Sequence, residues 1–366
     1  MKIVSQRDNL LRPLQQVGGV VERRQTLPIL ANVLIHADNG EISITATDLE
    51  VEMKTTSPVE CDETFDFTLP ARKLLDICRA LPEGANIQLE VKGEKALLRS
   101  GRSRFTLGVL PAQDYPSIEP TASSHRFSVP QKELKQLIEK TQFAMAQQDV
   151  RYYLNGMLLE VKQGVVRTVA TDGHRLALSE SDCQIESDVE LQVILPRKAV
   201  IELSRLLSES DETVDIDVSS NHIRIKMADT TFTSKLIDGK FPDYQKVIPS
   251  STDKEVTADK EELRLALQRT SILSNEKYRG IRFQFNTGTL QLMAHNPEQE
   301  EAEEEMEISY DGEQLVIGFN VGYLIEVLNV IDSDKVKLLL SDANSSCLIQ
   351  NFDSQDSNYV IMPMRL

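Results

Sequence analysis

Apolar residues recur at helical spacing near the start of each third of the chain. The three sets are Leu10, Leu11, Leu14 and Val17, then Leu134, Leu137, Ile138 and Thr141, then Leu263, Leu267 and Thr270. Pro13 fits the first of these helices poorly, because proline lacks an amide hydrogen and forfeits a backbone hydrogen bond unless it lies in about the first turn. A second helix is predicted over 74–81, 200–207 and 324–327, and alternation predicts strands such as 87–91, 214–218 and 336–340. Each third is therefore predicted to be α+β, with two helices covering one face of an antiparallel sheet.

The same short pattern closes an alternating run in every third: Ala46-Thr47-Asp48, Ala170-Thr171-Asp172 and Ala294-His295-Asn296. The spacings are equal, since 170 − 46 = 124 and 294 − 170 = 124. A repeat of this length is a whole domain rather than a solenoid unit. Polar stretches rich in Pro and Ser at 116–124 and 249–253 are typical of linkers. The predicted domains are 1–122, 123–250 and 251–366.

The composition is typical of a globular cytoplasmic protein. Of the 366 residues 40% are hydrophobic, and no stretch approaches the roughly 20 apolar residues of a membrane span. The first residues run straight into charge, so we expect no secretory signal. The four cysteines, Cys61, Cys78, Cys183 and Cys347, lack CxxC spacing. They are expected to be reduced thiols rather than a zinc site or a disulfide framework.

The net charge of −17 at first argues against a nucleic-acid partner, because an acidic protein repels a polyanion over ~8–10 Å in physiological salt. The cations nevertheless recur at corresponding positions of the repeat. Arg79 and Arg205 occupy corresponding places in the second helices, since 205 − 79 = 126, whereas the third domain has Asn329 there. The same helices open with Arg72-Lys73 and Arg197-Lys198, and the first helices add Arg7, Arg12, Lys132, Lys135, Lys140, Arg264 and Arg269. We expect these cations to line one basic surface, although each alone is typical of a solvated helix face.

The sequence contains no evident catalytic constellation. His174 has no serine or cysteine in a nucleophile-elbow context beside it, and neither HExxH nor GxGxxG occurs, so a structural turn histidine is favoured. Seven glutamates lie between 298 and 307 without the interleaved glycine, asparagine and carbonyl donors of a Mg²⁺ or Ca²⁺ site. An electrostatic role is favoured for this run.

Several motifs together resemble the bacterial DNA polymerase sliding clamp, the beta subunit of DNA polymerase III. They are Leu27-Pro28-Ile29-Leu30, Leu69-Pro70-Ala71-Arg72-Lys73, residues 99–105 and 149–156, Thr171-Asp172-Gly173-His174-Arg175-Leu176, Phe241-Pro242-Asp243-Tyr244, residues 296–302 and the terminal run 359–366. The resemblance extends from the first residue to the last. It implies a non-enzymatic, cofactor-free, head-to-tail homodimer whose six domains form a closed ring around duplex DNA, in the cytoplasm at the nucleoid.

The resemblance also implies two sets of binding residues. DNA contacts fall on Arg24, Arg72, Gln148, Tyr152 and Tyr153, to which the repeated cations add Arg79, Arg197, Lys198 and Arg205. Such contacts must be weak and blind to sequence if the ring is to slide. A groove for short peptides of the polymerase III alpha subunit, the clamp loader, other polymerases and repair proteins falls on Leu154, Thr171, Gly173, His174, Arg175, Leu176, Pro242, Lys246, Val247, Val360, Met362, Pro363, Met364 and Arg365. Family members often carry Arg where this chain has Lys246, which keeps the charge and changes the hydrogen-bonding fork.

Complementary surfaces at opposite ends of the sequence predict how two chains meet. Near the end of the first domain lie Lys73, Lys95, Arg102, Arg104, Phe105 and Leu107; the third domain offers Ile272, Leu273, Glu298, Glu300, Glu301 and Glu304. Different surfaces on one chain bind head to tail, and a half turn closes two copies into a ring. Two other classes stay open: a scaffold of the same domains that forms no ring, and an enzyme acting on nucleotides that binds metal through the glutamate run. The mass in solution tests the first, and a hydrolysis assay with Mg²⁺ tests the second.

Overall fold

A computed structural model describes residues 2–21, 27–61, 63–118, 122–185 and 189–365. Its contacts divide the chain into two compact units. Unit 1 comprises Met1–Lys132 and Ile201–Leu236, and unit 2 comprises Glu133–Val200 and Ile237–Leu366. The division passes through the middle third of the chain, so each unit receives half of the strands of the second domain.

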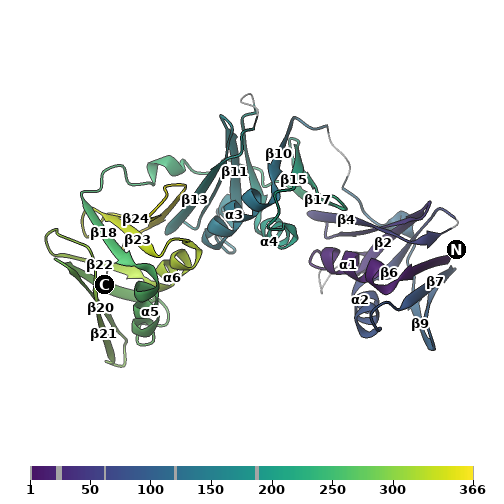
Figure 1. Cartoon of the computed structure of the whole chain (residues 1–366), viewed down its shortest axis with the longest axis horizontal. Helices are drawn as coiled ribbons and strands as arrows, with labels where there is room; N and C mark the ends of the chain where they lie inside the picture. Colours follow the sequence, from purple (N-terminus) through teal and green to yellow (C-terminus); the bar gives the residue numbers. More distant parts are fainter. Residues whose placement is uncertain (1, 22–26, 62, 119–121, 186–188, 366) are drawn as a thin grey trace. The chain divides into compact units, whose positions relative to one another are not determined.

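Unit 1 holds two antiparallel sheets, with orders β5-β1-β7-β8-β9 and β10-β15-β16-β17-β4-β3-β2-β6. Its strands are β1 (Lys2–Gln6), β2 (Asn32–Asp38), β3 (Glu41–Thr47), β4 (Val51–Pro58), β5 (Glu60–Cys61), β6 (Phe65–Pro70), β7 (Asn86–Lys92), β8 (Lys95–Ser100), β9 (Ser103–Gly108), β10 (His125–Pro130), β15 (Thr213–Val218), β16 (His222–Lys226) and β17 (Thr230–Lys235). Helices α1 (Arg7–Val17) and α2 (Ala71–Ala80) pack on each other, and α1 lies against β3 and β4 (Figure 1).

Unit 2 also holds two antiparallel sheets, with orders β14-β11-β12-β13-β25-β24-β23-β18 and β21-β20-β19-β22. Its strands are β11 (Gly156–Lys162), β12 (Val165–Thr171), β13 (Arg175–Asp182), β14 (Leu191–Pro196), β18 (Lys254–Asp259), β19 (Gly280–Asn286), β20 (Thr289–His295), β21 (Glu301–Glu307), β22 (Leu315–Asn320), β23 (Lys335–Leu340), β24 (Cys347–Asn351) and β25 (Ser357–Ile361). Helices α5 (Lys260–Ser271) and α6 (Val321–Val330) pack on each other, and α5 lies against β20 and β21. The remaining helices, α3 (Gln131–Thr141) and α4 (Arg197–Leu206), belong to the second domain.

The helices follow the apolar pattern, because Leu10, Leu14 and Val17 on α1 are buried, as are Leu263 and Leu267 on α5. Side chains cap two of them: the Asp259 carboxylate accepts from the Glu262 N–H, and the Asn320 amide oxygen accepts from the Gly322 N–H.

Pro13 is the awkward member of the first helix, as the sequence indicated. Pro13 sits in the middle of α1 and is buried. Its burial offsets part of the free energy that the lost backbone hydrogen bond costs.

All three domains repeat one topology. The first strand and the last three strands form one half-sheet: β1-β7-β8-β9, β10-β15-β16-β17 and β18-β23-β24-β25. The four middle strands form the other: β6-β2-β3-β4, β14-β11-β12-β13 and β22-β19-β20-β21. The α+β domains with two helices each are confirmed. The finer finding is that each domain divides its strands between two sheets, and that two of the sheets continue from one domain into the next.

We call a strand pair that continues a sheet from one domain into the next a joint. The two joints within the chain use equivalent edge strands. The middle half-sheet of the first domain joins the second domain through β4 and β17, and that of the second joins the third through β13 and β25. Among the described residues, the equivalent edges β21 and β9 have no neighbouring strand on their outer side.

Candidate peptide groove and nucleic-acid surface

An apolar cluster in unit 2 spans the joint between β13 and β25. Leu176 and Val360 are both buried and face each other across the joint. Tyr244 is a buried member of the same cluster, and Tyr153 and Val247 pack against it while partly exposed. The structure thus brings together residues from three separate stretches of the predicted groove set, represented by Leu176, Val247 and Val360.

The tight turn 171–175 forms one lip of the groove. The Asp172 carboxylate accepts hydrogen bonds from the N–H groups of His174 and Arg175, at 2.9 and 3.0 Å. Gly173 has φ of +88°, and a Cβ there would lie 2.9 Å from the Arg151 Nη2 atom. Glycine is therefore needed at this position for both conformation and space.

Arg151 fixes the neighbouring loop, and the predicted site set did not include it. Its guanidinium donates to both carboxylate oxygens of Asp149, at 3.0 and 2.8 Å, and to the Asp172 carbonyl at 3.3 Å. The hydrogen bonds from Arg151 lower the pKa of Asp149 to about 2. The only sequence signal was the Asp-x-Arg spacing directly before the tyrosine pair Tyr152 and Tyr153.

Arg175, a predicted groove residue, is buried, with 9% of its surface exposed, and it contacts several neighbouring side chains. Its guanidinium carbon lies 4.4 Å from the centroid of the Tyr323 ring and 5.2 Å from that of Phe143. It also binds the Glu326 carboxylate and donates to the Phe143 carbonyl at 2.7 Å. Arg175 therefore fixes the start of β13 to α6 of the third domain.

A polar network supports the cluster from beneath. The Tyr244 hydroxyl donates to Glu160 Oε1 at 2.8 Å, and Gln192 and Arg167 also donate to this carboxylate. Burial opposes ionisation of Glu160, but these hydrogen bonds outweigh it, and the pKa of Glu160 lies below its ordinary value. The network thereby holds Tyr244 in place.

The segment after β25 forms the other lip. The Met362 N–H donates to the His174 carbonyl at 3.0 Å, and the Met362 side chain is left 38% exposed. Pro242 and His174 are exposed beside it, whereas Leu154 is buried behind the groove. Lys246 is an exposed rim cation paired with Asp243 at 2.8 Å. A flexible methionine beside proline gives a surface that can fit several peptides.

The predicted DNA residues lie on two equivalent helices and one loop. Arg72 and Arg79 are exposed on α2, and with Asp76 they line a hollow of about 410 Å³ between α1 and α2. On α4, Arg205 pairs with Glu202 at 2.8 Å, and Arg197 donates to the Met145 carbonyl at 3.1 Å. The remaining members are Lys198 on α4 and, in the loop, Gln148, Tyr152 and Tyr153, whose two rings meet edge to face at 5.8 Å. Arg24 lies outside the described residues.

Not every helix cation belongs to an open basic surface. Lys140 has only 14% of its side chain exposed, and it pairs with Asp332 at 3.2 Å and Asp356 at 3.8 Å. Arg269 donates from Nε and Nη2 to the two carboxylate oxygens of Glu304, at 2.6 and 2.9 Å, which ties α5 to β21. Acids of the third domain therefore neutralise these two cations, and the shared basic surface stays a prediction.

The predicted contact residues between copies lie on or beside the two unpaired edges. Arg102 in the turn before β9 and Arg104 on it are exposed, Phe105 is half-buried and Leu107 is buried; Lys95 on β8 and Lys73 on α2 are exposed nearby. In the third domain, Ile272 is 76% exposed at the end of α5 and Leu273 follows it half-buried. Glu298, Glu300 and Glu301 are exposed at the start of β21, and Glu304 is half-buried on it.

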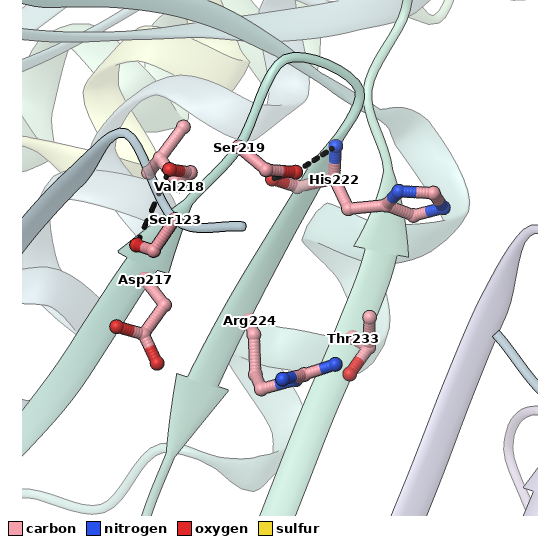
Figure 2. A pocket seen from close by; sticks show the side chains of 7 residues that line it. All are labelled: Ser123, Asp217, Val218, Ser219, His222, Arg224 and Thr233. Atoms are coloured by element: carbon pink, nitrogen blue, oxygen red, sulfur yellow. Dashed lines mark hydrogen bonds between the residues drawn. The ribbon is translucent and has the colours of Figure 1, made fainter. Parts of the chain in front are cut away.

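A second histidine, His222, lines a small pocket of unit 1. Figure 2 shows it next to Ser219, with Arg224 and Asp217 further along the pocket. The Ser219 hydroxyl is bonded to the backbone of His222 rather than to its imidazole, whose Nδ1 faces Asn221. Burial and the cations Lys235 and Arg224 lower the pKa of His222.

Across the described ranges, no group of three or more His, Cys, Asp or Glu side chains is placed to hold a metal ion. Within those ranges no helix is long and apolar enough to cross a bilayer.

Three domains of one topology, sheets that pass between domains and an apolar groove at one joint define the sliding-clamp class. Family models of the DNA polymerase III beta subunit match the N-terminal domain at residues 1–119, the central domain at 128–243 and the C-terminal domain at 245–365. The chain belongs to the DNA polymerase III beta subunit family.

Individual relatives agree over their full lengths. The chain is 55% identical to the beta sliding clamp of Pseudomonas aeruginosa and 49% identical to that of Escherichia coli, with complete coverage of each chain. A crystal structure of the P. aeruginosa clamp bound to griselimycin superposes with a TM-score of 0.97 at 55% identity, and the Caulobacter crescentus polymerase III beta with 0.94 at 39%, again with full coverage. The protein is accordingly a DNA sliding clamp, a non-catalytic processivity factor of bacterial replication in the cytoplasm.

Proposed function

We propose that two copies close into a six-domain ring through strands β9 and β21, and that this ring slides on nucleoid DNA while its groove holds polymerases. The observation that carries the proposal is the repeated joint. Two joints within the chain already pair a middle-half-sheet edge with a last-strand edge, β4 with β17 and β13 with β25. The third pair of equivalent edges, β21 and β9, lies at opposite ends of the chain. A second copy satisfies both edges, head to tail.

The existing joints supply the register of the proposed one. Phe232 faces Met53 at the first joint and Tyr359 faces Ala177 at the second. Phe105 occupies the place of these aromatics, because Phe105 pairs with Leu98 on β8 as Phe232 pairs with Ile225 on β16.

Ala302 occupies the place of Met53 and Ala177, since each pairs with the alanine of the 124-residue repeat. We therefore place Ala302 opposite Phe105 of the second copy. Counting along both strands then sets Glu303 opposite Arg104 and Glu305 opposite Arg102, so opposite charges meet on the outer face.

The helix layer repeats in the same way. Arg175 begins β13 and lies over Tyr323 on α6. The corresponding residue before β21 is Glu300, and the residue of α2 that corresponds to Tyr323 is Lys73. An ion pair between Glu300 and Lys73 of the second copy follows. Opposite charges at this place select the third domain of one copy for the first domain of another.

Ile272 supplies the apolar part of this joint. In the repeat, Ile272 corresponds to Phe143 at the second joint and to Gly19 at the first. Gly19 lies close to α4, because a Cβ at this position would be 1.8 Å from a carboxylate oxygen of Glu202. The end of each first helix thus lies against the second helix of the next domain. An isoleucine that is 76% exposed in the single chain becomes buried on α2 of the second copy.

The basic helices fit a sliding contact with duplex DNA. On α2 the sequence Arg72, Asp76, Arg79 places two cations on one stripe with an acid between them, and Lys198, Glu202 and Arg205 repeat it on α4. Cations diluted by acids bind phosphates weakly, and the enclosing ring supplies persistence. The groove of Leu176, Val247, Val360 and Met362 suits apolar side chains of short peptides from polymerases, the clamp loader and repair proteins.

A disulfide scan tests the joint and its register. Glu303→Cys and Arg104→Cys in one chain should form disulfides between copies under mild oxidation, because directly opposite Cβ atoms lie about 4.5–5.5 Å apart. The control pair Glu303→Cys and Gly108→Cys is out of register by four residues and should cross-link poorly. Equal cross-linking of the two pairs, or none in either, would contradict the proposed joint. The domain boundaries at 1–122, 123–250 and 251–366 stay part of this proposal.

A further inference from the structure

The third domain contains an open hollow of about 400 Å³ that adjoins the predicted peptide groove, because Met364 and Arg365 of the groove set also line it. Its other lining residues are Asn275, Tyr278, Gly280, His295, Asn296 and Pro297. Tyr278 is 57% exposed, whereas Leu30 and Leu154, which precede the corresponding strands β2 and β11, are buried. The hollow exists because the third domain lacks a buried side chain where the other two have one.

The repeat shows what fills this place in the first domain. Gly280, Met293 and His295 correspond to Asn32, Thr45 and Thr47, since 280 − 32 = 248, 293 − 45 = 248 and 295 − 47 = 248, twice the repeat of 124. Those three residues surround a buried tyrosine. The Thr47 N–H donates to the Tyr115 hydroxyl at 3.2 Å, and that hydroxyl lies 3.2 and 3.3 Å from the carbonyls of Asn32 and Thr45.

The backbone that carries Tyr115 is held as an extended strap. Three residues further on, the Ile118 N–H donates to a Glu52 carboxylate oxygen at 3.0 Å. Glu52 pairs with Thr47 across β3 and β4 as Glu301 pairs with His295 across β20 and β21. Glu301 is exposed, so the corresponding acceptor is available in the third domain.

In the second domain, aromatic side chains also cover the corresponding part of the middle half-sheet. Val169 corresponds to Met293, and it packs in one cluster with Phe241 and Tyr244 from the segment after β17. In both domains, therefore, aromatic side chains on a segment that follows the last strand cover this part of the middle half-sheet. Aromatic rings with a polar handle suit a site with apolar walls and backbone groups at its floor.

We propose that the hollow of the third domain is a second peptide site, which takes an extended segment of a partner protein carrying a tyrosine. The tyrosine ring lies between Tyr278, Pro297 and Met364. Its hydroxyl meets the backbone around His295 and Gly280, as that of Tyr115 does in the first domain, and a backbone N–H three residues later reaches Glu301.

The chain itself provides the probe. A fluorescent, end-blocked peptide with the sequence of residues 110–118 is titrated against the full-length dimer, beside the same peptide with its tyrosine replaced by alanine. The tyrosine peptide should bind with a Kd below about 1 mM, and the alanine peptide at least about tenfold more weakly. Equal binding of both peptides, or none to either, would overturn the proposal.

Protein variants locate the binding. Pro297→Glu and Tyr278→Ala change exposed residues, and each should weaken the tyrosine peptide at least about tenfold without changing the dimer mass. A leucine-rich polymerase peptide should bind these variants normally and should not displace the tyrosine peptide. Displacement by the leucine-rich peptide would assign the tyrosine peptide to the groove. Unchanged affinity in both variants would place it outside the hollow. Either result would refute the inference.

Discussion

The guanidinium of Arg175 stacks 4.4 Å above the ring of Tyr323 and joins the second domain to the third. The pair stands where a sheet continues between domains, and Glu326 and the Phe143 carbonyl complete its contacts. In the joint that we propose between two copies, the corresponding residues are Glu300 of one copy and Lys73 of the other. The proposal thus replaces a cation–aromatic contact within the chain by an ion pair between chains.

Charge reversal tests this correspondence. Glu300→Lys alone and Lys73→Glu alone should each weaken the dimer by about 1 kcal/mol per joint, or about 30-fold in Kd over the two joints of a ring. The double variant should recover most of the loss, because the pair is re-created with inverted sign. Sedimentation equilibrium at low and high salt measures both effects. A double variant whose dimer is weaker than that of either single variant would show that Glu300 and Lys73 do not meet between copies.

Removal of the apolar contact should give monomers. Ile272→Ala with Leu273→Ala deletes side chains that are exposed or half-exposed in the single chain, so the fold should persist. The dimer loses apolar burial at roughly 25 cal/mol per Å² at each joint. Leu265→Ala, also an exposed leucine on α5, is the matched control and should stay dimeric. If the Ile272 and Leu273 variant is still fully dimeric at nanomolar concentration, the joint lies elsewhere.

Peptide binding should depend on Met362. Its side chain is 38% exposed at the lip of the groove while its N–H is held by His174, so truncation removes contact surface without freeing the backbone. Met362→Ala should weaken a leucine-rich polymerase peptide about tenfold, measured by fluorescence anisotropy. Val316→Ala, which trims a similarly exposed residue on β22, serves as control. Unchanged affinity in Met362→Ala would remove this residue from the site.

The Glu160 network should make the second domain sensitive to acid. The folded pKa of Glu160 is below its ordinary value of 4.5, so its contribution to stability is present above about pH 4.5 and is lost as the pH falls through the folded pKa. Glu160→Gln should lower the free energy of unfolding by about 2 kcal/mol at pH 7 and by less at pH 4. Denaturant unfolding at both pH values measures the difference, with Glu180→Gln, a more exposed partner of Arg167, as control. A difference that is constant or grows toward pH 4 would contradict this role.

The sequence predicted the elements better than their assembly. Helix positions and the threefold repeat follow from local periodicity, which is why Leu10, Leu134 and Leu263 mark equivalent helices. The joints do not follow from it, because the pairing of Phe232 with Met53 links strands of different domains, and no local pattern encodes that choice.

Only part of the candidate groove could be predicted from the sequence. Leu176, Val360 and Met362 were identified through the family resemblance, and the structure brings them together. Arg151 and Asp149 were missed, because a short-range ion pair that shapes a loop has no periodic signature. Arg175 was named only for the groove, although it also contacts Glu326 and Tyr323 of the third domain. Burial and partner identity decide such roles, and both are properties of the folded chain.

Retention on closed and open DNA tests the ring most directly. The protein is loaded onto nicked circular duplex DNA, and half of the sample is then linearised with a restriction enzyme. Salt is raised to a level at which proteins that rely on phosphate contacts dissociate. A closed ring predicts that the protein stays on the circle and is lost from the linear DNA through its ends. Equal retention on the two templates, or equal loss from both, would contradict the account.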